Sequence, residues 1–74
     1  MRIELIFADE VRDKQAKFLL VENELSTNEL VAKGQIERLG ESLKAEGCAI
    51  QSVSKTKDAC IVYVHKAASN NVIL

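Results

Sequence analysis

The sequence predicts an α+β fold in which one helix, at about 27–46, packs on a mostly antiparallel four-stranded sheet, with the elements in the order β-β-α-β-β. Apolar residues recur at helical spacing in the middle of the chain, and short runs rich in apolar and β-branched residues lie on both sides of this region. The 74 residues suffice for one domain, which we expect at 1–66, followed by a frayed tail or short edge strand at 67–74.

Within residues 2–8, at the start of the chain, Ile3, Leu5 and Phe7 recur at every second position and alternate with charged residues at 2 and 4. Ile3 and Phe7 lie on one side of this alternation, and Arg2 and Glu4 lie on the other. A period of two is typical of a strand with one buried face, so the first element is predicted to be a strand.

Four apolar residues in succession, at 18–21, lie within the segment 17–24. In a helix they would point in all directions around the axis, so a buried second strand is favoured. The polar residues 9–15 contain no glycine or proline and fit either a loop or a helical turn. A single helix over 9–24 is the competing interpretation.

The helix at 27–46 has the strongest local signals. Ser26 and Glu29 have the spacing of a capping box, and Leu25 and Leu30 stand at the positions of a hydrophobic staple. Gly47 suits the left-handed position that ends many helices. The predicted apolar stripe has spacings of four, three and four residues and consists of Ala32, Ile36, Leu39 and Leu43.

The last third of the chain predicts a hairpin. Segments 49–54 and 59–65 flank the polar residues 55–58. Residues 60–64 are apolar on both faces, which is typical of a central strand.

The two cysteines are expected to be reduced and buried. A turn centred on Thr56 and Lys57 would place Val53 opposite Cys60. Cys48 would then lie about 17 Å from Cys60 at roughly 3.3 Å per residue. That separation is too large for a disulfide, and neither cysteine belongs to a Cys-x-x-Cys motif.

No group of residues predicts catalysis, a metal site or a cofactor site. His65 and Cys60 are five residues apart in one strand and would lie on opposite faces of the sheet. The acidic cluster of Asp9, Glu10 and Asp13 lacks the glycine and spacing of a calcium-binding loop. We therefore expect no enzymatic activity, no metal and no cofactor.

The charge balance argues against a general affinity for nucleic acid. Ten Lys and Arg residues against eleven Asp and Glu residues give a net charge of −1. A small basic patch at Lys55, Lys57 and Lys66, joined by Arg2 or Lys17, can nevertheless contact phosphates. A nucleic-acid-binding regulator that uses the basic hairpin at Lys55 and Lys57 is therefore the alternative function.

The favoured function is protein–protein interaction. One helix covers one face of a sheet, whereas residues 19–21 and 60–64 are apolar on both faces. A second copy would cover the other face, so we expect a homodimer with Gly40, Val62 and Val64 at the dimer or partner interface. The expected protein is a small, non-enzymatic regulator or inhibitor that acts by binding a partner protein.

The sequence also predicts a cytoplasmic location. No stretch approaches the roughly 20 apolar residues of a membrane span. The first residues lack the basic patch followed by about 7–15 apolar residues that marks a secretory signal. We expect no membrane partner.

Overall fold

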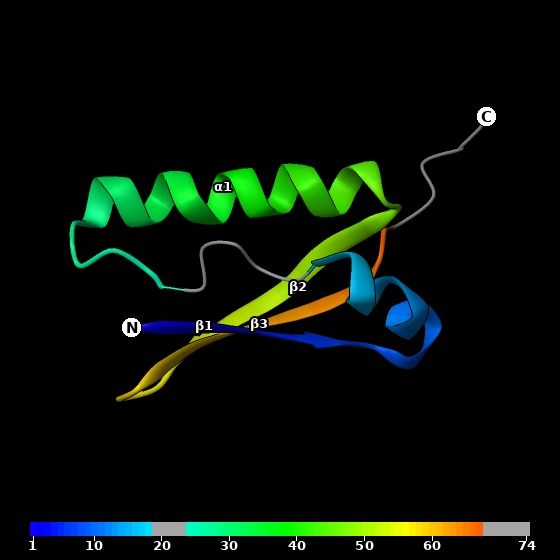
Figure 1. Ribbon diagram of the computed structural model, residues 1–74, viewed down its shortest axis with the longest axis horizontal. Coiled ribbons are helices and arrows are strands. Elements are labelled where there is room, and N and C mark those ends of the chain that lie inside the picture. Colours follow the sequence, from blue (N-terminus) through cyan, green and yellow to red (C-terminus); the bar gives the residue numbers. More distant parts are fainter. Residues whose placement is uncertain (19–23, 68–74) are drawn as a thin grey trace.

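Residues 1–18 and 24–67 are described by the structure, a computed structural model (Figure 1). The elements follow in the order β1 (Arg2–Phe7), η1 (Asp9–Phe18), α1 (Glu29–Ala45), β2 (Cys48–Lys55) and β3 (Ala59–Lys66), where η1 is a 3₁₀ helix. The strands form a sheet in the order β1-β3-β2, and α1 packs on one face of it (Figure 1). This arrangement is α+β, as predicted.

The predicted four-stranded, mostly antiparallel sheet is wrong. Among residues 1–18 and 24–67, the sheet has three strands; β1 pairs with β3 in parallel, and β2 pairs with β3 in antiparallel fashion. A parallel pair needs a long connection, and η1, α1 and β2 together supply it between β1 and β3. Periodicity along the chain predicts which segments are strands but carries no information about which strands pair.

The predicted second strand at 17–24 is replaced at its start by helical structure. Lys17 and Phe18 belong to η1, residues 19–23 lie outside the described residues, and Glu24 forms an isolated antiparallel bridge with Arg2. The helical-turn alternative for 9–15 is confirmed. Val11 is only 4% exposed and packs in the core, so it anchors η1 against the rest of the fold.

The predicted helix is confirmed, but its start is displaced. The N-cap is Asn28, whose Oδ1 accepts hydrogen bonds from the backbone N–H groups of Leu30 and Val31 at 3.0 and 3.2 Å. Ser26 instead accepts a hydrogen bond from the N–H of Asn28. Asn and Ser are comparably good caps, so the local pattern does not choose between them. Leu30 is 83% exposed and does not form the predicted staple.

The end of α1 joins it closely to β2. Gly47 has a φ of +75°, which confirms the predicted left-handed position, and its N–H donates to the carbonyl of Lys44 at 3.1 Å. Only Glu46 and Gly47 separate the helix from β2. The C-terminal end of α1 is therefore held against the sheet.

The predicted hairpin is confirmed with a different register. Val53 lies opposite Val62, whereas a turn centred on Thr56 and Lys57 would place it opposite Cys60. The loop consists of residues 56–58, and the hydroxyl of Thr56 accepts hydrogen bonds from the backbone N–H groups of Asp58 and Ala59. The turn is therefore centred on Lys57 and Asp58, one residue later than the prediction assumed.

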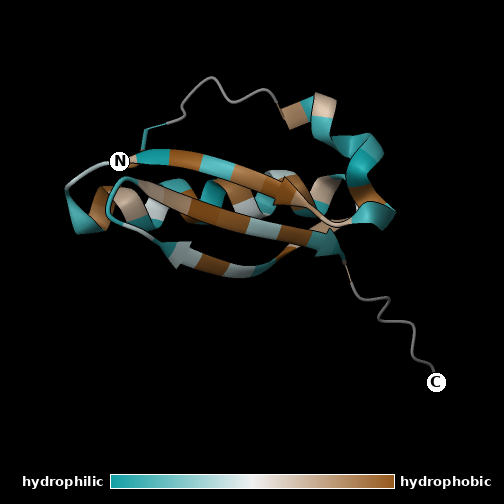
Figure 2. Cartoon of the chain, turned by 90° about the horizontal axis from the view of Figure 1, so that it is seen from below, coloured by the Kyte–Doolittle hydropathy of each residue, from teal (hydrophilic) through white to brown (hydrophobic). Residues whose placement is uncertain are grey.

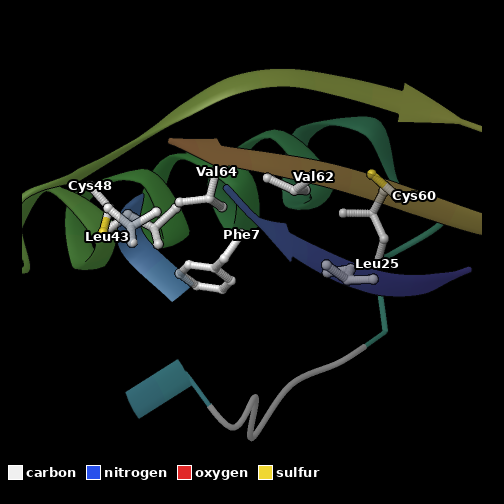
Figure 3. Close-up of a cluster of buried hydrophobic side chains, with 9 residues drawn as sticks. Phe7, Leu25, Leu43, Cys48, Cys60, Val62 and Val64 are labelled. Carbon is white, nitrogen blue, oxygen red and sulfur yellow. The ribbon is translucent and has the colours of Figure 1, made fainter. Parts of the chain in front are cut away.

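The core lies between α1 and the inner face of the sheet (Figure 3). In the parallel pairing, Ile3 lies opposite Cys60, and Phe7 lies opposite Val64, so these four side chains share that face. Val11 of η1 closes one end of this layer. The core residues are Ile3, Phe7, Val11, Leu25, Leu43, Cys48, Cys60, Val62 and Val64.

Of the tail expected at 67–74, Ala67 belongs to the described part. Its N–H donates to the carbonyl of Gly47 at 2.9 Å, which ties the end of β3 to the start of β2. Residues 68–74 lie outside the described residues.

Candidate interaction surfaces

Val62 and Val64, expected at an interface, belong to the core. They are 0% and 1% exposed and lie beneath α1 (Figure 3). Neither side chain is accessible to a second chain in this fold. Because side chains alternate along a strand, Ile61 and Tyr63 point to the opposite face of the sheet.

That opposite face carries an apolar centre, which we call the outer patch and define as Ile6, Ile61 and Tyr63. Ile6 is 44% exposed and lies opposite Tyr63, and Ile61 and Tyr63 are half-buried. Figure 2 views the sheet from this side, with the strands in front of α1. Within residues 1–18 and 24–67, no helix or strand lies over the outer patch (Figure 2). The described part of the chain therefore leaves the apolar centre uncovered.

Polar side chains surround the outer patch. Ser52 lies opposite Tyr63, and Glu4 lies opposite Ile61. Glu4 forms an ion pair with Arg2, with 3.4 Å between Oε1 and Nη2. An apolar centre with a polar rim is the usual anatomy of a protein–protein interface.

Gly40 lies over β2 of its own chain. A Cβ at this position would approach Ile50 Cδ1 to 3.8 Å, an ordinary van der Waals contact. The backbone of α1 therefore does not need a glycine at this position to fit against the sheet. Gly40 also lines a shallow depression with Glu37, Glu41 and Lys44, whose rim is charged.

A second surface, which sequence reasoning missed, is a groove of about 400 Å³. It lies between the N-terminal half of α1 and the end of the sheet near the β2–β3 turn. Its lining residues are Met1, Leu25, Ser26, Thr27, Glu29, Ala32, Lys33, Ile36 and Lys55. The predicted apolar stripe contains Ala32 and Ile36, but nothing local shows that these two would stay partly uncovered.

The basic residues expected to form one patch are separated. Lys66 lies opposite Cys48 at the far end of β3, whereas Lys55 lies opposite Cys60, six residues away along that strand. At roughly 3.3 Å per residue this separation is about 20 Å. Lys55 and Lys57 therefore remain as the basic pair of the hairpin.

The two residues considered as additions to that patch are engaged elsewhere. Arg2 is close to the hairpin end, opposite Ala59, but forms an ion pair with Glu4. Lys17 donates to Glu46 at 3.1 Å and joins η1 to the end of α1. Neither side chain is available to extend a phosphate-binding surface while these contacts hold.

The two cysteines are free and buried, as predicted. Cys48 Sγ lies 3.7 Å from the carbonyl oxygen of Glu46, within donating distance. Burial raises the pKa of the Cys48 thiol, an effect that Lys14 opposes and Glu46 and Asp13 reinforce. A protonated, enclosed thiol is a poor nucleophile.

The other polar residues considered as candidate sites lie apart within the described residues. His65 lies on the face of the sheet opposite to Cys60, and Asp9 forms an ion pair with Arg12. Among the residues that the structure describes, no three His, Cys, Asp or Glu side chains lie close enough to hold a metal ion. Within the same residues, no helix has the length and apolar character needed to cross a membrane. No known protein family, curated protein or solved structure matches this chain.

Proposed function

We propose that this chain is a small, non-enzymatic interaction module that forms a homodimer through the outer patch and acts as a regulator or inhibitor by binding a partner protein. The observation that carries the proposal is the 44% exposure of Ile6 beside Tyr63, on a sheet face that no described element covers. Exposed apolar surface of this kind is typical of interaction sites.

The size of the chain supports self-association. A domain of this length buries only about 60% of the surface of its unfolded chain, and small domains are often stabilised by oligomerisation. The two cysteines are free thiols, so no disulfide between them supplements the core. Covering the outer patch with a second copy would add apolar burial on both chains.

The charges around the outer patch also support a dimer. The row that crosses the sheet at its centre, formed by Ile6, Tyr63 and Ser52, is uncharged. Glu4, at the margin, is already paired with Arg2. A symmetric contact can therefore bury the centre without burying an unpaired charge.

We further propose a cytoplasmic location. Free, buried thiols such as Cys48 and Cys60 are usual in a reducing compartment, where disulfides rarely persist.

The test of the dimer is sedimentation equilibrium over a range of micromolar concentrations. Ile6→Lys should yield a monomer because it places a charge at the centre of the outer patch, and it should keep the fold because Ile6 lies on an edge strand and is 44% exposed. Val53→Lys is the matched control, since Val53 is 41% exposed but lies on the opposite face of the sheet. It should remain dimeric.

Two results would contradict this function. One is a wild-type chain that sediments as a monomer at every concentration. The other is an Ile6→Lys variant that dimerises as strongly as the wild type while circular dichroism shows the native fold.

A nucleic-acid-binding regulator is the alternative, favoured by one observation. Lys55 and Lys57 are both exposed at the hairpin, and neither forms an ion pair within the described part of the chain. Under this alternative, the anisotropy of a labelled oligonucleotide should rise with protein and fall steeply with salt. Replacing both lysines by alanine should weaken that binding.

A further inference from the structure

The groove beside the N-terminal half of α1 has a wall that hydrogen bonds hold in place. This wall is the segment that leads into α1. The side chain of Gln35 ties it to the helix, because Oε1 accepts from the N–H of Ser26 at 2.8 Å and Nε2 donates to the carbonyl of Glu24 at 2.9 Å. On the other side, the N–H of Leu25 donates to the carbonyl of Met1 at 2.6 Å. The groove is therefore built into the fold of the single chain.

The groove opens because α1 and the sheet diverge. Figure 1 shows them close together at the C-terminal end of α1 and apart toward the β2–β3 turn. Leu43, near the closed end, is 0% exposed, whereas Ala32 and Ile36, near the open end, are half-buried. Together with Leu25, these two residues give the groove an aliphatic lining. Among the described residues, no aromatic side chain lines it.

Two cations from different elements flank this lining. Lys33 from α1 and Lys55 from β2 both line the groove and are exposed, and in the part of the chain that the structure describes neither forms an ion pair. Glu29 is the acidic residue in the lining, and the N-terminal amine of Met1 is paired with Glu24 at 3.1 Å. Two unpaired lysines against one glutamate leave a positive charge that complements an anionic group.

The size of the groove suits a small molecule. Its volume is about 400 Å³. Small-molecule sites span roughly 300–1,000 Å³ and combine a mostly apolar lining with a few polar groups that fix the orientation of the ligand. Residues before α1, within α1 and at the end of β2 all contribute to the lining, so the groove is bounded on more than one side. A compact aliphatic ligand fits such a site.

We propose that this groove binds a small amphiphile, an aliphatic chain that carries one anionic head group. The chain packs on Leu25, Ala32 and Ile36, and the head group pairs with Lys33 and Lys55. This binding is separate from the proposed dimer, because the groove lies on the α1 side of the sheet and the outer patch lies on the other side.

The test titrates the isotope-labelled full chain with decanoate, which joins an aliphatic chain to a carboxylate. In nuclear magnetic resonance spectra, decanoate should shift the methyl signals of Leu25, Ala32 and Ile36 to saturation. Decyl phosphate should shift the same signals, and the tighter of the two anions identifies the head group. Shifts centred on Ile6 and Ile61 would instead place the probe on the outer patch and overturn the proposal, as would the binding of neither anion.

Decanol and acetate test the two halves of the ligand separately. Decanol lacks the charge and should bind about fivefold more weakly than decanoate. Acetate lacks the chain and should not saturate these signals at the same concentrations, because it buries almost no apolar surface. Decanol that binds as tightly as decanoate would overturn the role of the lysines. Acetate that binds as tightly would overturn the role of the aliphatic lining.

Charge reversal tests the two cations directly. Lys33→Glu combined with Lys55→Glu should weaken decanoate binding by about tenfold. Arg38→Glu combined with Lys57→Glu is the matched control, since it makes the same change in net charge on the same helix and hairpin, at residues that do not line the groove. Equal weakening by the two pairs would overturn a specific role for the groove.

Filling the groove tests its aliphatic part. Ala32→Leu places a larger side chain in the lining and should weaken decanoate binding by roughly tenfold. Val31→Leu is the control, because Val31 is 51% exposed and does not line the groove. Circular dichroism checks that both variants keep the fold. Unchanged binding by a folded Ala32→Leu variant would overturn the proposal.

The outcome is separable from the proposed dimer. Ile6→Lys leaves the groove intact, so a monomeric Ile6→Lys variant should bind decanoate with unchanged affinity. A dimeric wild type that binds neither decanoate nor decyl phosphate refutes the groove and leaves the dimer standing. A monomeric wild type that binds decanoate at the groove refutes the dimer and supports the ligand site.

Discussion

Ile6 and Tyr63 lie opposite each other in the parallel pairing of β1 and β3, on the side of the sheet away from α1. Tyr63 is the only tyrosine, and the chain has no tryptophan. Its fluorescence therefore reports directly on the outer patch. Tyr63 belongs to the second apolar face of the central strand, which is the face that α1 does not cover.

The accessibility of Tyr63 is expected to fall as the protein concentration rises. A dimer that buries the outer patch shields the ring from a soluble quencher such as acrylamide. Quenching of tyrosine fluorescence should decrease with concentration in the wild type and stay constant in Ile6→Lys. Wild-type quenching that does not change with protein concentration would contradict burial of this face by a second copy.

Asn28→Ala is expected to lower the free energy of unfolding by about 1 kcal/mol. The substitution removes the side chain that accepts from the N–H groups of Leu30 and Val31. Ser26→Ala is the control and should cost less, because Ser26 accepts only from the N–H of Asn28. Urea denaturation measures the free energy of unfolding of both variants. A larger loss for Ser26→Ala would indicate that Ser26, as in the predicted capping box, is the residue that caps the helix.

Gly47→Ala is expected to destabilise the chain by about 1–2 kcal/mol, because a Cβ is strained at positive φ. Gly47 has a φ of +75°. Gly34→Ala should act in the opposite direction, stabilising by about 1 kcal/mol, because Gly34 is within the helix. A Cβ there would meet only Arg38 Nη1 at 3.5 Å. Thermal unfolding that shows the same sign for both variants would contradict this assignment.

Leu43→Ala should cost about 3 kcal/mol, since it opens a cavity in the core. Leu43 is 0% exposed, whereas Leu30, in the same helix, is 83% exposed. Leu30→Ala makes the same chemical change and should alter stability by less than about 0.5 kcal/mol. Comparable losses in urea denaturation would mean that α1 does not pack on the sheet through this face.

The stability contributed by Cys48 is expected to fall in alkaline solution. Burial raises the pKa of its thiol above the ordinary value of 9.0, with Lys14 opposing and Glu46 and Asp13 adding to the shift. The unfolded chain therefore releases this proton first as the pH rises, so the contribution is complete below pH 9.0 and decreases above it. The difference in unfolding free energy between the wild type and Cys48→Ala should be constant below that pH and shrink above it. A difference that grows above it would contradict the burial of the thiol.

Local signals predicted the helix and the hairpin because the forces that form them act over a few residues. The stripe that ends at Leu43 and the glycine at position 47 determine where α1 runs and where it ends. The start of the helix was less predictable, since Ser26 and Asn28 are both suitable caps. The hairpin register shifted because the turn is centred on residues 57 and 58 and is closed by the hydroxyl of Thr56, a contact that the pattern of apolar residues does not reveal.

The outer patch could be predicted only in part. The apolar run at 60–64 predicts two apolar faces, and one helix predicts that one of them stays open. The prediction assigned the wrong residues of β3 to the interface. Val62 and Val64 face α1, while Ile61 and Tyr63 face away from it. The groove could not be predicted at all, since it depends on the angle between α1 and the sheet.

The sequence by itself determined that this protein has one amphipathic helix, a C-terminal hairpin, two buried thiols and more apolar strand surface than that helix can cover. Only the tertiary structure decided that β1 pairs with β3 in parallel, that Ile6 meets Tyr63 on the open face, and that Lys33 and Lys55 line one groove. The first set depends on spacings between neighbouring residues. The second depends on contacts between residues far apart in the chain, which packing selects and no local pattern encodes.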